Sequence, residues 1–171
     1  MNKKLAVAGG VLLLTFGVAV AGTVGDRFHQ DSAGDKFGAP EFSLDLFGIW
    51  ESHDRSHFDH DAIGFGAGVN YFFNRYFGAS AETSVDELAL PNHLDISAIA
   101  RYPLEKYSLA PYVFGGFGRQ WRDESQWTGH IGGGVEYRFN RTTGLFTDIR
   151  GIFCEDTRDI ALWRVGVRLV F

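Results

Sequence analysis

The sequence of 171 residues predicts an all-β protein, an eight-stranded antiparallel up-and-down transmembrane β-barrel. Three observations predict this fold. Apolar residues alternate with polar or small ones along eight segments, each close to the ten residues that a tilted strand needs to cross a bilayer. Short breaks between segments alternate with breaks that are on average longer and more acidic, as expected for strands joined in up-and-down order. The aromatic residues gather near the segment ends, as in membrane-embedded barrels.

The eight alternating segments are residues 41–50, 62–73, 76–85, 93–104, 110–121, 127–139, 144–153 and 160–171. Seven of them keep one parity throughout, so each has an apolar face and a polar face. The fifth keeps no single parity. There, Gly115 and Gly116 predict a β-bulge that exchanges the two faces of the strand.

The two faces decide between a membrane barrel and a soluble one, because a soluble barrel would turn its charged face to water. Aromatic residues on the apolar face separate into two groups. One group lies toward the short breaks, and its members are Phe42, Tyr71, Phe73, Phe77, Tyr102, Tyr137, Phe139 and Phe171. The other lies toward the longer breaks, and its members are Trp50, Trp121, Trp127 and Trp163. Two such girdles fit the two interfaces of a bilayer, so we expect the apolar face outside and the charged face inside.

Charges on the inner face are expected to pair, because an eight-stranded barrel has room only for side chains and isolated buried charges are costly. The predicted network joins four carboxylates with five guanidinium groups: Asp45, Glu82, Glu136 and Asp148 with Arg101, Arg138, Arg150, Arg164 and Arg168. Glycines on the same face, such as Gly64, Gly66, Gly68, Gly132 and Gly134, are expected to leave room for these long side chains. We interpret the network as a plug that makes the barrel rigid. The alternative is an ion path or gate.

The chain divides into three parts. Residues 1–21 have two lysines, a short apolar stretch and the small residues Ala19 and Ala21, which predict a secretory signal peptide; a membrane anchor is the alternative. Residues 22–40 lack periodicity and predict a flexible lead-in, and residues 41–171 form the barrel. Cleavage after Ala21 removes two of the 16 basic residues and none of the 21 acidic ones, leaving a charge of −7 that disfavours nucleic acid as a partner.

The last strand resembles the C-terminal signature of bacterial outer-membrane proteins. A terminal Phe follows apolar residues at alternate positions, and here these are Trp163, Val165, Val167, Leu169 and Phe171. The resemblance implies that these five residues are an assembly signal for the barrel-assembly machinery. It also implies that the chain resides in the outer membrane of a Gram-negative-type bacterium, with both termini in the periplasm.

Residues 41–171 resemble the small eight-stranded outer-membrane barrels of the OmpA/OmpX and opacity-protein type, and the stretch APYVFGGFG is similar to their Pro-Tyr-Val-Gly-rich strand. The resemblance implies a structural or surface-interaction role, with the lipid bilayer and lipopolysaccharide as partners. The first long break is the expected contact surface, because function often lies on loops held by a rigid scaffold. A narrow pore or a metal-binding surface protein is the alternative. One departure is that only this first loop is sizeable, whereas adhesive members often have several long loops.

Histidines are concentrated in that first loop. His53, His57 and His60 alternate with carboxylates there and are the candidate metal ligands, although their spacing matches no established metal motif. A solvated acidic loop is the competing interpretation. We expect no other cofactor.

Catalysis is not expected. Some outer-membrane barrels of this size modify lipid A with a Ser and a His at the outer rim, and His130 lies on a strand with Glu136 on the same parity. Residue 132, where a nucleophilic Ser would be needed, is Gly132. Ser52 and Ser125 are expected in loops and have no evident base and orienting carboxylate.

Overall fold

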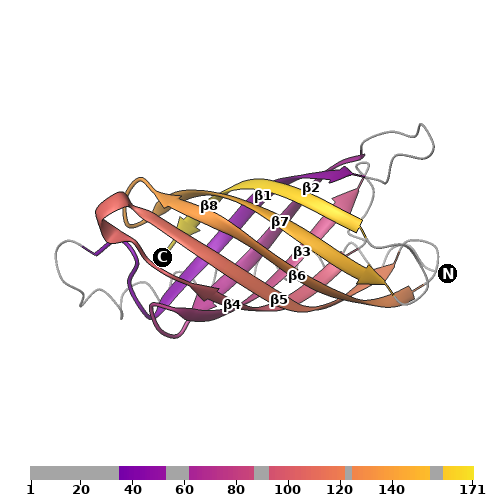
Figure 1. The fold of residues 1–171 in the computed structure, drawn as a ribbon, viewed down its shortest axis with the longest axis horizontal. Helices are drawn as coiled ribbons and strands as arrows, with labels where there is room; N and C mark the ends of the chain where they lie inside the picture. The colour runs from indigo at the N-terminus through magenta and orange to yellow at the C-terminus, as the bar shows by residue number, and fades with distance from the viewer. Residues whose placement is uncertain (1–34, 53–61, 87–92, 122–124, 155–159) are drawn as a thin grey trace.

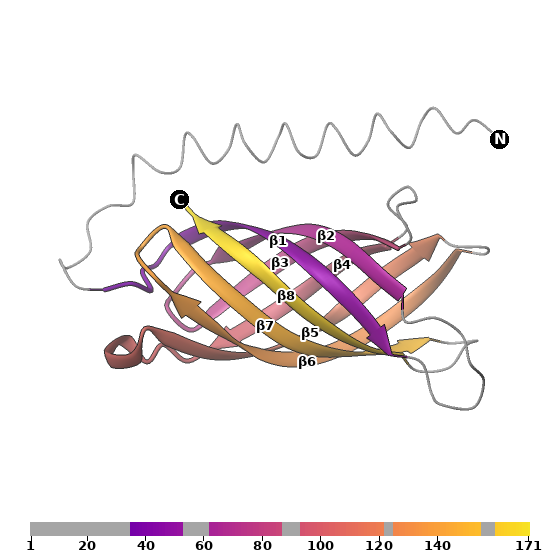
Figure 2. The ribbon, with the colours of Figure 1, turned by 90° about the horizontal axis from the view of Figure 1, so that it is seen from above.

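The computed structural model describes residues 35–52, 62–86, 93–121, 125–154 and 160–171. These residues form a closed, antiparallel barrel in which each strand pairs with the next along the chain and the last pairs with the first (Figures 1 and 2). The strands are β1 (Glu41–Ser52), β2 (Ala62–Phe72), β3 (Phe77–Asp86), β4 (His93–Arg101), β5 (Leu109–Trp121), β6 (Ser125–Arg138), β7 (Thr143–Cys154) and β8 (Ile160–Val170). The predicted eight-stranded up-and-down barrel is confirmed, and closure pairs each of the described strands on both sides.

The two ends of the barrel differ. Connections 73–76, 102–108 and 139–142 are short and define the short-turn end, at the left of Figure 1. Asn74 tightens the first of these turns, because its Oδ1 accepts hydrogen bonds from the N–H groups of Tyr76 and Phe77, both at 2.8 Å. The second contains the single-turn 3₁₀ helix η2 (Glu105–Tyr107). The opposite end, where β1, β3, β5 and β7 finish, is called the loop end below.

The predicted bulge in β5 is wrong. The register with β4 pairs Ala98 with Gly115 and Ser97 with Gly116, with no extra residue, and the pairing with β6 is equally continuous. A Cβ on Gly116 would collide with the backbone carbonyl of Ile96, so Gly116 permits a close approach of two strands. The sequence pattern was misleading because Tyr112 and Phe114 point inward, where polar residues were expected.

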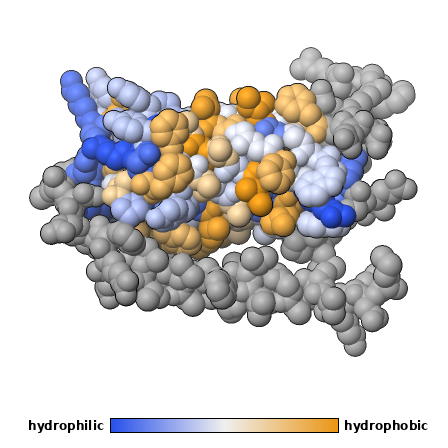
Figure 3. Space-filling view, turned by 90° about the horizontal axis from the view of Figure 1, so that it is seen from below, coloured by the Kyte–Doolittle hydropathy of each residue, from blue (hydrophilic) through white to orange (hydrophobic). Residues whose placement is uncertain are grey.

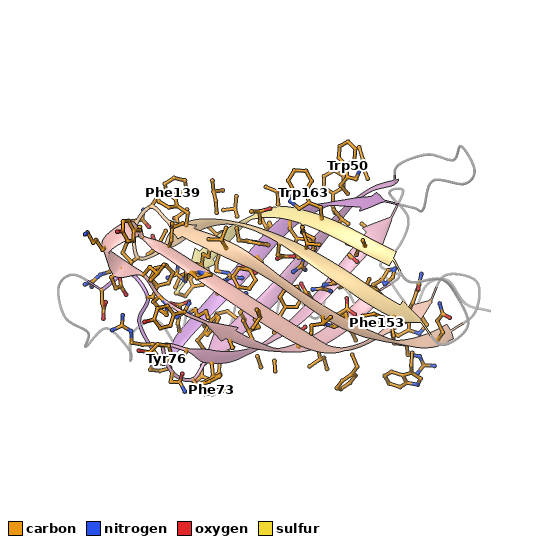
Figure 4. All side chains as sticks on the ribbon, viewed as in Figure 1. Trp50, Phe73, Tyr76, Phe139, Phe153 and Trp163 are labelled. Atoms are coloured by element: carbon orange, nitrogen blue, oxygen red, sulfur yellow. The ribbon has the colours of Figure 1, made fainter. Side chains whose placement is uncertain are left out.

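The outer surface is apolar along the barrel wall. Figure 3 shows hydrophobic side chains over the middle of the barrel and hydrophilic ones at the short-turn end. Phe73, Tyr76 and Phe139 lie toward the short-turn end in Figure 4, whereas Trp50 and Phe153 lie toward the loop end. Large apolar side chains on this surface remain exposed, among them Ile149 at 64%. None of the described residues forms a helix long and apolar enough to cross a membrane.

The interior contains aromatic rings as well as charges. Phe47, Phe114 and Phe146 are each at most 6% exposed and occupy the polar parity of their strands. Glycines make space for these rings: a Cβ on Gly132 would collide with the Phe114 ring, and one on Gly166 would lie 2.6 Å from the Phe146 ring. Gly68 and Gly134 instead face the Cβ atoms of Glu82 and Asp148. The inward glycines therefore accommodate rings and carboxylate side chains alike.

Candidate functional site

The first of two groups of buried ion pairs lies toward the short-turn end. It contains three carboxylates and three guanidinium groups, and we call it the short-turn cluster: Glu41, Asp45, Glu136, Arg101, Arg138 and Arg168. Arg101 Nη1 and Arg138 Nη2 donate to Glu41 Oε1 at 2.8 Å and 2.7 Å. The charges of this cluster balance.

Glu136 connects the two halves of the short-turn cluster. Its Oε1 accepts a hydrogen bond from Arg138 Nε, and its Oε2 accepts one from Arg168 Nη1 at 2.6 Å. Both Glu136 and Arg138 are fully buried. Each charge therefore has a partner on another strand or two residues away on its own strand, as buried charges require.

The second group, the central cluster, lies next along the barrel: Glu82, Asp95, Asp148, Arg150 and Arg164. Glu82 pairs with both arginines. Arg164 also binds Asp148 through Nε and Nη2, at 2.7 Å and 2.9 Å, and the Tyr112 hydroxyl donates to Asp148 Oδ2 at 2.6 Å. Arg150 Nη1 donates to Asp95 Oδ2 at 2.9 Å. Here three carboxylates meet two guanidinium groups.

Aromatic faces cover the guanidinium groups. The Arg164 guanidinium lies 4.8 Å from the Phe47 ring centroid, that of Arg150 lies 5.0 Å from Phe114, and that of Arg168 lies 5.2 Å from Phe146. Contacts of this length favour a cation over a ring face. The inward rings thus fill the space between ion pairs and attract the arginines at the same time.

The segment before β1 covers the short-turn cluster. Phe37 is fully buried, with the guanidinium groups of Arg138 and Arg101 at 4.8 Å and 5.4 Å from its ring centroid. Lys36 Nζ donates to Ser108 Oγ at 2.8 Å and to the carbonyl oxygens of Arg138 and Phe139 at 3.1 Å. Within the predicted lead-in 22–40, residues 35–40 are thus the described part, and they lie against the barrel mouth.

The neighbouring turn strengthens this contact. The Arg75 guanidinium binds Asp35 at 2.7 Å and Glu105 at 2.6 Å. The backbone N–H of Lys36 donates to Glu105 Oε2 at 3.1 Å. Two different turns therefore hold residues 35 and 36 in place.

A Ser–His–Asp arrangement also lies inside the barrel. Ser97 Oγ and His130 Nε2 are 2.7 Å apart, and His130 Nδ1 lies 3.6 Å from Asp95 Oδ1. The latter distance is too long for a hydrogen bond, and Asp95 already binds Arg150. Ser97 is 3% exposed and His130 is 5% exposed. Both side chains are buried and His130 Nδ1 lacks an orienting hydrogen bond, so the geometry supports packing rather than acyl transfer.

The nine charged residues of the predicted network all lie on the inner face, and every one makes an ion pair. Two carboxylates of the observed clusters were absent from that predicted set. Glu41 is the first residue of β1, and its inward parity was its only signal. Asp95 shares the inward parity of β4, and this parity places it on the charged face from the sequence, although not in the predicted network. Phe37 precedes the periodic part of the chain and left no signal.

The other predicted site residues are the five residues of the assembly signal and the three candidate metal ligands. The five residues of the predicted assembly signal lie on the outward parity at the end of the chain, and Phe171 N donates to Phe42 O at 2.9 Å. His53, His57 and His60 lie outside the described residues. Within the described ranges, no group of three or more His, Cys, Asp or Glu side chains is placed to hold a metal ion.

Comparison with solved structures shows related folds. The chain is similar to the N-terminal β-barrel domain of Pseudomonas aeruginosa OprF, with 17% identity, a TM-score of 0.65, and coverage of 78% of this chain and 99% of that one. It is also similar to Ail, the attachment invasion locus protein of Yersinia pestis, with 16% identity, a TM-score of 0.57, and coverage of 77% and 98%.

A third similar structure is Neisserial surface protein A, with 12% identity, a TM-score of 0.53, and coverage of 75% and 95%. No protein-family model matches the chain, and no curated protein matches it. At these identities the likeness concerns architecture: the chain has the fold of the small eight-stranded outer-membrane barrels.

Proposed function

We propose that this protein is a non-conducting barrel of the outer membrane, with a structural or surface-interaction role. The observation that supports this proposal most directly is that side chains fill the interior of the barrel. Two clusters of ion pairs, interleaved with aromatic rings, occupy the lumen, and Phe37 covers one mouth. An ion path would need a water-filled lumen or a ring of like-charged side chains that attracts ions, whereas the charges in this lumen bind one another.

The apolar outer wall supports the membrane location. In water, so many exposed Phe, Trp, Ile and Val side chains would form patches that promote association, whereas lipid chains would cover them. The proposal includes export through a signal peptide at residues 1–21, and assembly through the terminal strand with Phe171.

The proposed orientation puts both termini and the short-turn end in the periplasm, and the loop end outside. The short connections are those that outer-membrane barrels have on the periplasmic side. The loops that follow β1, β3, β5 and β7 would then form the outward contact surface, with lipopolysaccharide around them. The proposal includes no enzymatic activity, and the burial of Ser97 and His130 supports this part of it.

Single-channel recording in planar bilayers tests this proposal. Purified mature chain inserted at neutral pH is expected to add no sustained ohmic steps to the baseline. Insertion has to be shown independently, by the difference in electrophoretic mobility between boiled and unboiled samples recovered from the same vesicles. Stable, reproducible conductance steps from inserted protein would instead support the narrow pore, and the plug would then be a gate.

A further inference from the structure

Residues 35–38, which precede β1, are held against the barrel by side chains rather than by the sheet. We call these residues the latch. They belong to no strand, and none of the backbone–backbone hydrogen bonds in the described part of the chain involves them. Their hydrogen bonds to the barrel each have a side-chain atom as donor or acceptor. The latch is therefore separate from the hydrogen-bond ladder that holds the strands together.

The partners of the latch come from three different connections at the short-turn end. Between β2 and β3, Arg75 forms an ion pair with Asp35 at 2.7 Å. Between β4 and β5, Ser108 Oγ accepts a hydrogen bond from Lys36 Nζ at 2.8 Å. Between β6 and β7, the carbonyl oxygen of Phe139 accepts a hydrogen bond from the same Nζ at 3.1 Å. The latch thus contacts the rim of the short-turn mouth at three places.

The latch covers two guanidinium groups of the short-turn cluster. The fully buried Phe37 ring lies beside both Arg101 and Arg138, with its centroid 5.4 Å and 4.8 Å from their guanidinium carbons. Arg138 Nη1 donates to the carbonyl oxygen of Lys36 at 2.8 Å. Likewise, Arg101 Nη2 donates to the carbonyl oxygen of Gly38 at 3.2 Å. Displacing the latch would uncover both guanidinium groups and remove one hydrogen-bond partner from each.

The ion pairs beneath the latch involve strand residues. Glu41 binds both arginines, with its Oε1 at 2.8 Å from Arg101 Nη1 and at 2.7 Å from Arg138 Nη2. These residues belong to β1, β4 and β6, so their contacts do not require the latch. Segments that are held by few contacts outside the ladder open at a lower free energy than the whole fold. The latch therefore has the contacts of a unit that opens alone.

We propose that the latch opens and closes over the short-turn mouth while the strands stay paired, and that it controls the access of water and small solutes to the short-turn cluster. The central cluster lies next along the barrel and stays enclosed in both states. This inference rests on the filled lumen of the proposed function, to which it adds a movable cover at one end.

Modification of arginine side chains by phenylglyoxal, mapped by mass spectrometry, tests the proposal on the mature chain folded in detergent. Arg138 reports on the latch, and Arg164 of the central cluster reports on opening of the barrel itself. Arg138 is fully buried whereas Arg164 is 6% exposed, so a barrel without a movable latch predicts slower modification of Arg138. We expect the opposite order in the parent chain, because opening of the latch uncovers Arg138 and leaves Arg164 enclosed.

Lys36→Ala should speed the modification of Arg138 about tenfold, because it removes the hydrogen bonds that Lys36 Nζ donates to the rim. The rate at Arg164 should stay unchanged. The matched control is Lys106→Ala, which removes an exposed lysine from the same end of the barrel. Lys106 lies over the Tyr107 ring at 5.5 Å, so its loss should leave both rates unchanged.

The heat-dependent shift in electrophoretic mobility shows whether each variant has folded. If Lys36→Ala loses this shift, Arg75→Gln takes its place, because it removes the ion pair with Asp35. Arg75→Gln is expected to speed the modification of Arg138 severalfold and to leave the rate at Arg164 unchanged.

Any of three outcomes would overturn the latch: modification of Arg138 that is no faster than that of Arg164 in the parent, a rate at Arg138 that the latch variant leaves unchanged, or an equal acceleration by Lys106→Ala. This assay does not measure conductance. Conductance steps in planar bilayers would therefore refute the non-conducting barrel without refuting the latch. A failed latch test would, in turn, leave the absence of conductance in place.

Discussion

Arg168 binds Asp45 through two parallel hydrogen bonds at the seam where the barrel closes. Arg168 Nε donates to Asp45 Oδ1 at 2.8 Å, and Nη2 donates to Oδ2 at 2.7 Å. The two residues are also register partners of β8 and β1, the strands farthest apart in the sequence. This bidentate pair therefore adds a side-chain link to the backbone ladder that completes the cylinder.

Arg168→Gln is expected to destabilise the barrel by about 3 kcal/mol, because it leaves the buried Asp45 without its partner and removes one partner of Glu136. Urea unfolding in lipid vesicles, followed by tryptophan fluorescence, measures the change. Lys106→Gln, an exposed site at the same end, is the control and should be neutral. A loss below about 0.5 kcal/mol for Arg168→Gln would mean that the seam does not depend on this pair.

The central cluster predicts energetic coupling between β4 and β7. Asp95→Asn and Arg150→Gln should each lower the free energy of unfolding, and the double variant should lose less than the sum, by about 1–3 kcal/mol. The reason is that each single substitution already breaks the Asp95–Arg150 ion pair, so the second substitution breaks no further contact between these two side chains. Strict additivity in this double-mutant cycle would show that the two side chains act independently.

Glycine positions inside the barrel predict steric effects. Gly132→Ala should cost about 1–3 kcal/mol, because the new methyl group would collide with the Phe114 ring and lie 2.5 Å from the Ile149 carbonyl oxygen. Gly129→Ala on the same strand is the matched control, since nothing lies within 4 Å of its Cβ position. The midpoint of thermal unfolding compares the two variants, and an equal effect of both would contradict the ring-accommodating role of Gly132.

Phe37 predicts that the segment before β1 contributes to stability. Phe37→Ala should destabilise the barrel by about 3 kcal/mol, because it removes a fully buried ring from between two guanidinium groups. Phe73→Ala is the control, since its ring lies on the outer face at 58% exposure. Urea unfolding again provides the measurement. Equal losses for the two variants would mean that Phe37 does not seal the mouth.

The outer wall could be predicted from the sequence because lipid imposes one rule on it. Outward positions that face the lipid chains must be apolar or small, and the pleat then produces a period of two, as for Trp163, Val165 and Val167. The inner face obeys a looser rule. Charged, glycine and aromatic residues can all face the lumen if their shapes and charges are complementary. The inward rings of Tyr112 and Phe114 therefore made β5 look as if its two faces were exchanged, which led to the wrong prediction of a bulge.

Ion-pair partners could not be assigned from the sequence for a similar reason. Arg138 and Glu41 are 97 residues apart, and only closure of the barrel brings β6 and the start of β1 to the same level. The list of inward charges follows from parity alone. Which charges pair with one another depends on how all eight strands are staggered around the barrel, and the sequence of a single strand does not specify this stagger.

The central claim is that the apolar face meets lipid and the polar face is enclosed. Brominated-lipid quenching of single tryptophans tests it, with the four native tryptophans replaced by Phe. Phe65→Trp reports on an outward position, 55% exposed, and Phe146→Trp reports on an inward one, 3% exposed. Bromine on the acyl chains should quench the first strongly and the second weakly. Equal quenching, or stronger quenching at position 146, would contradict the assignment of the two faces.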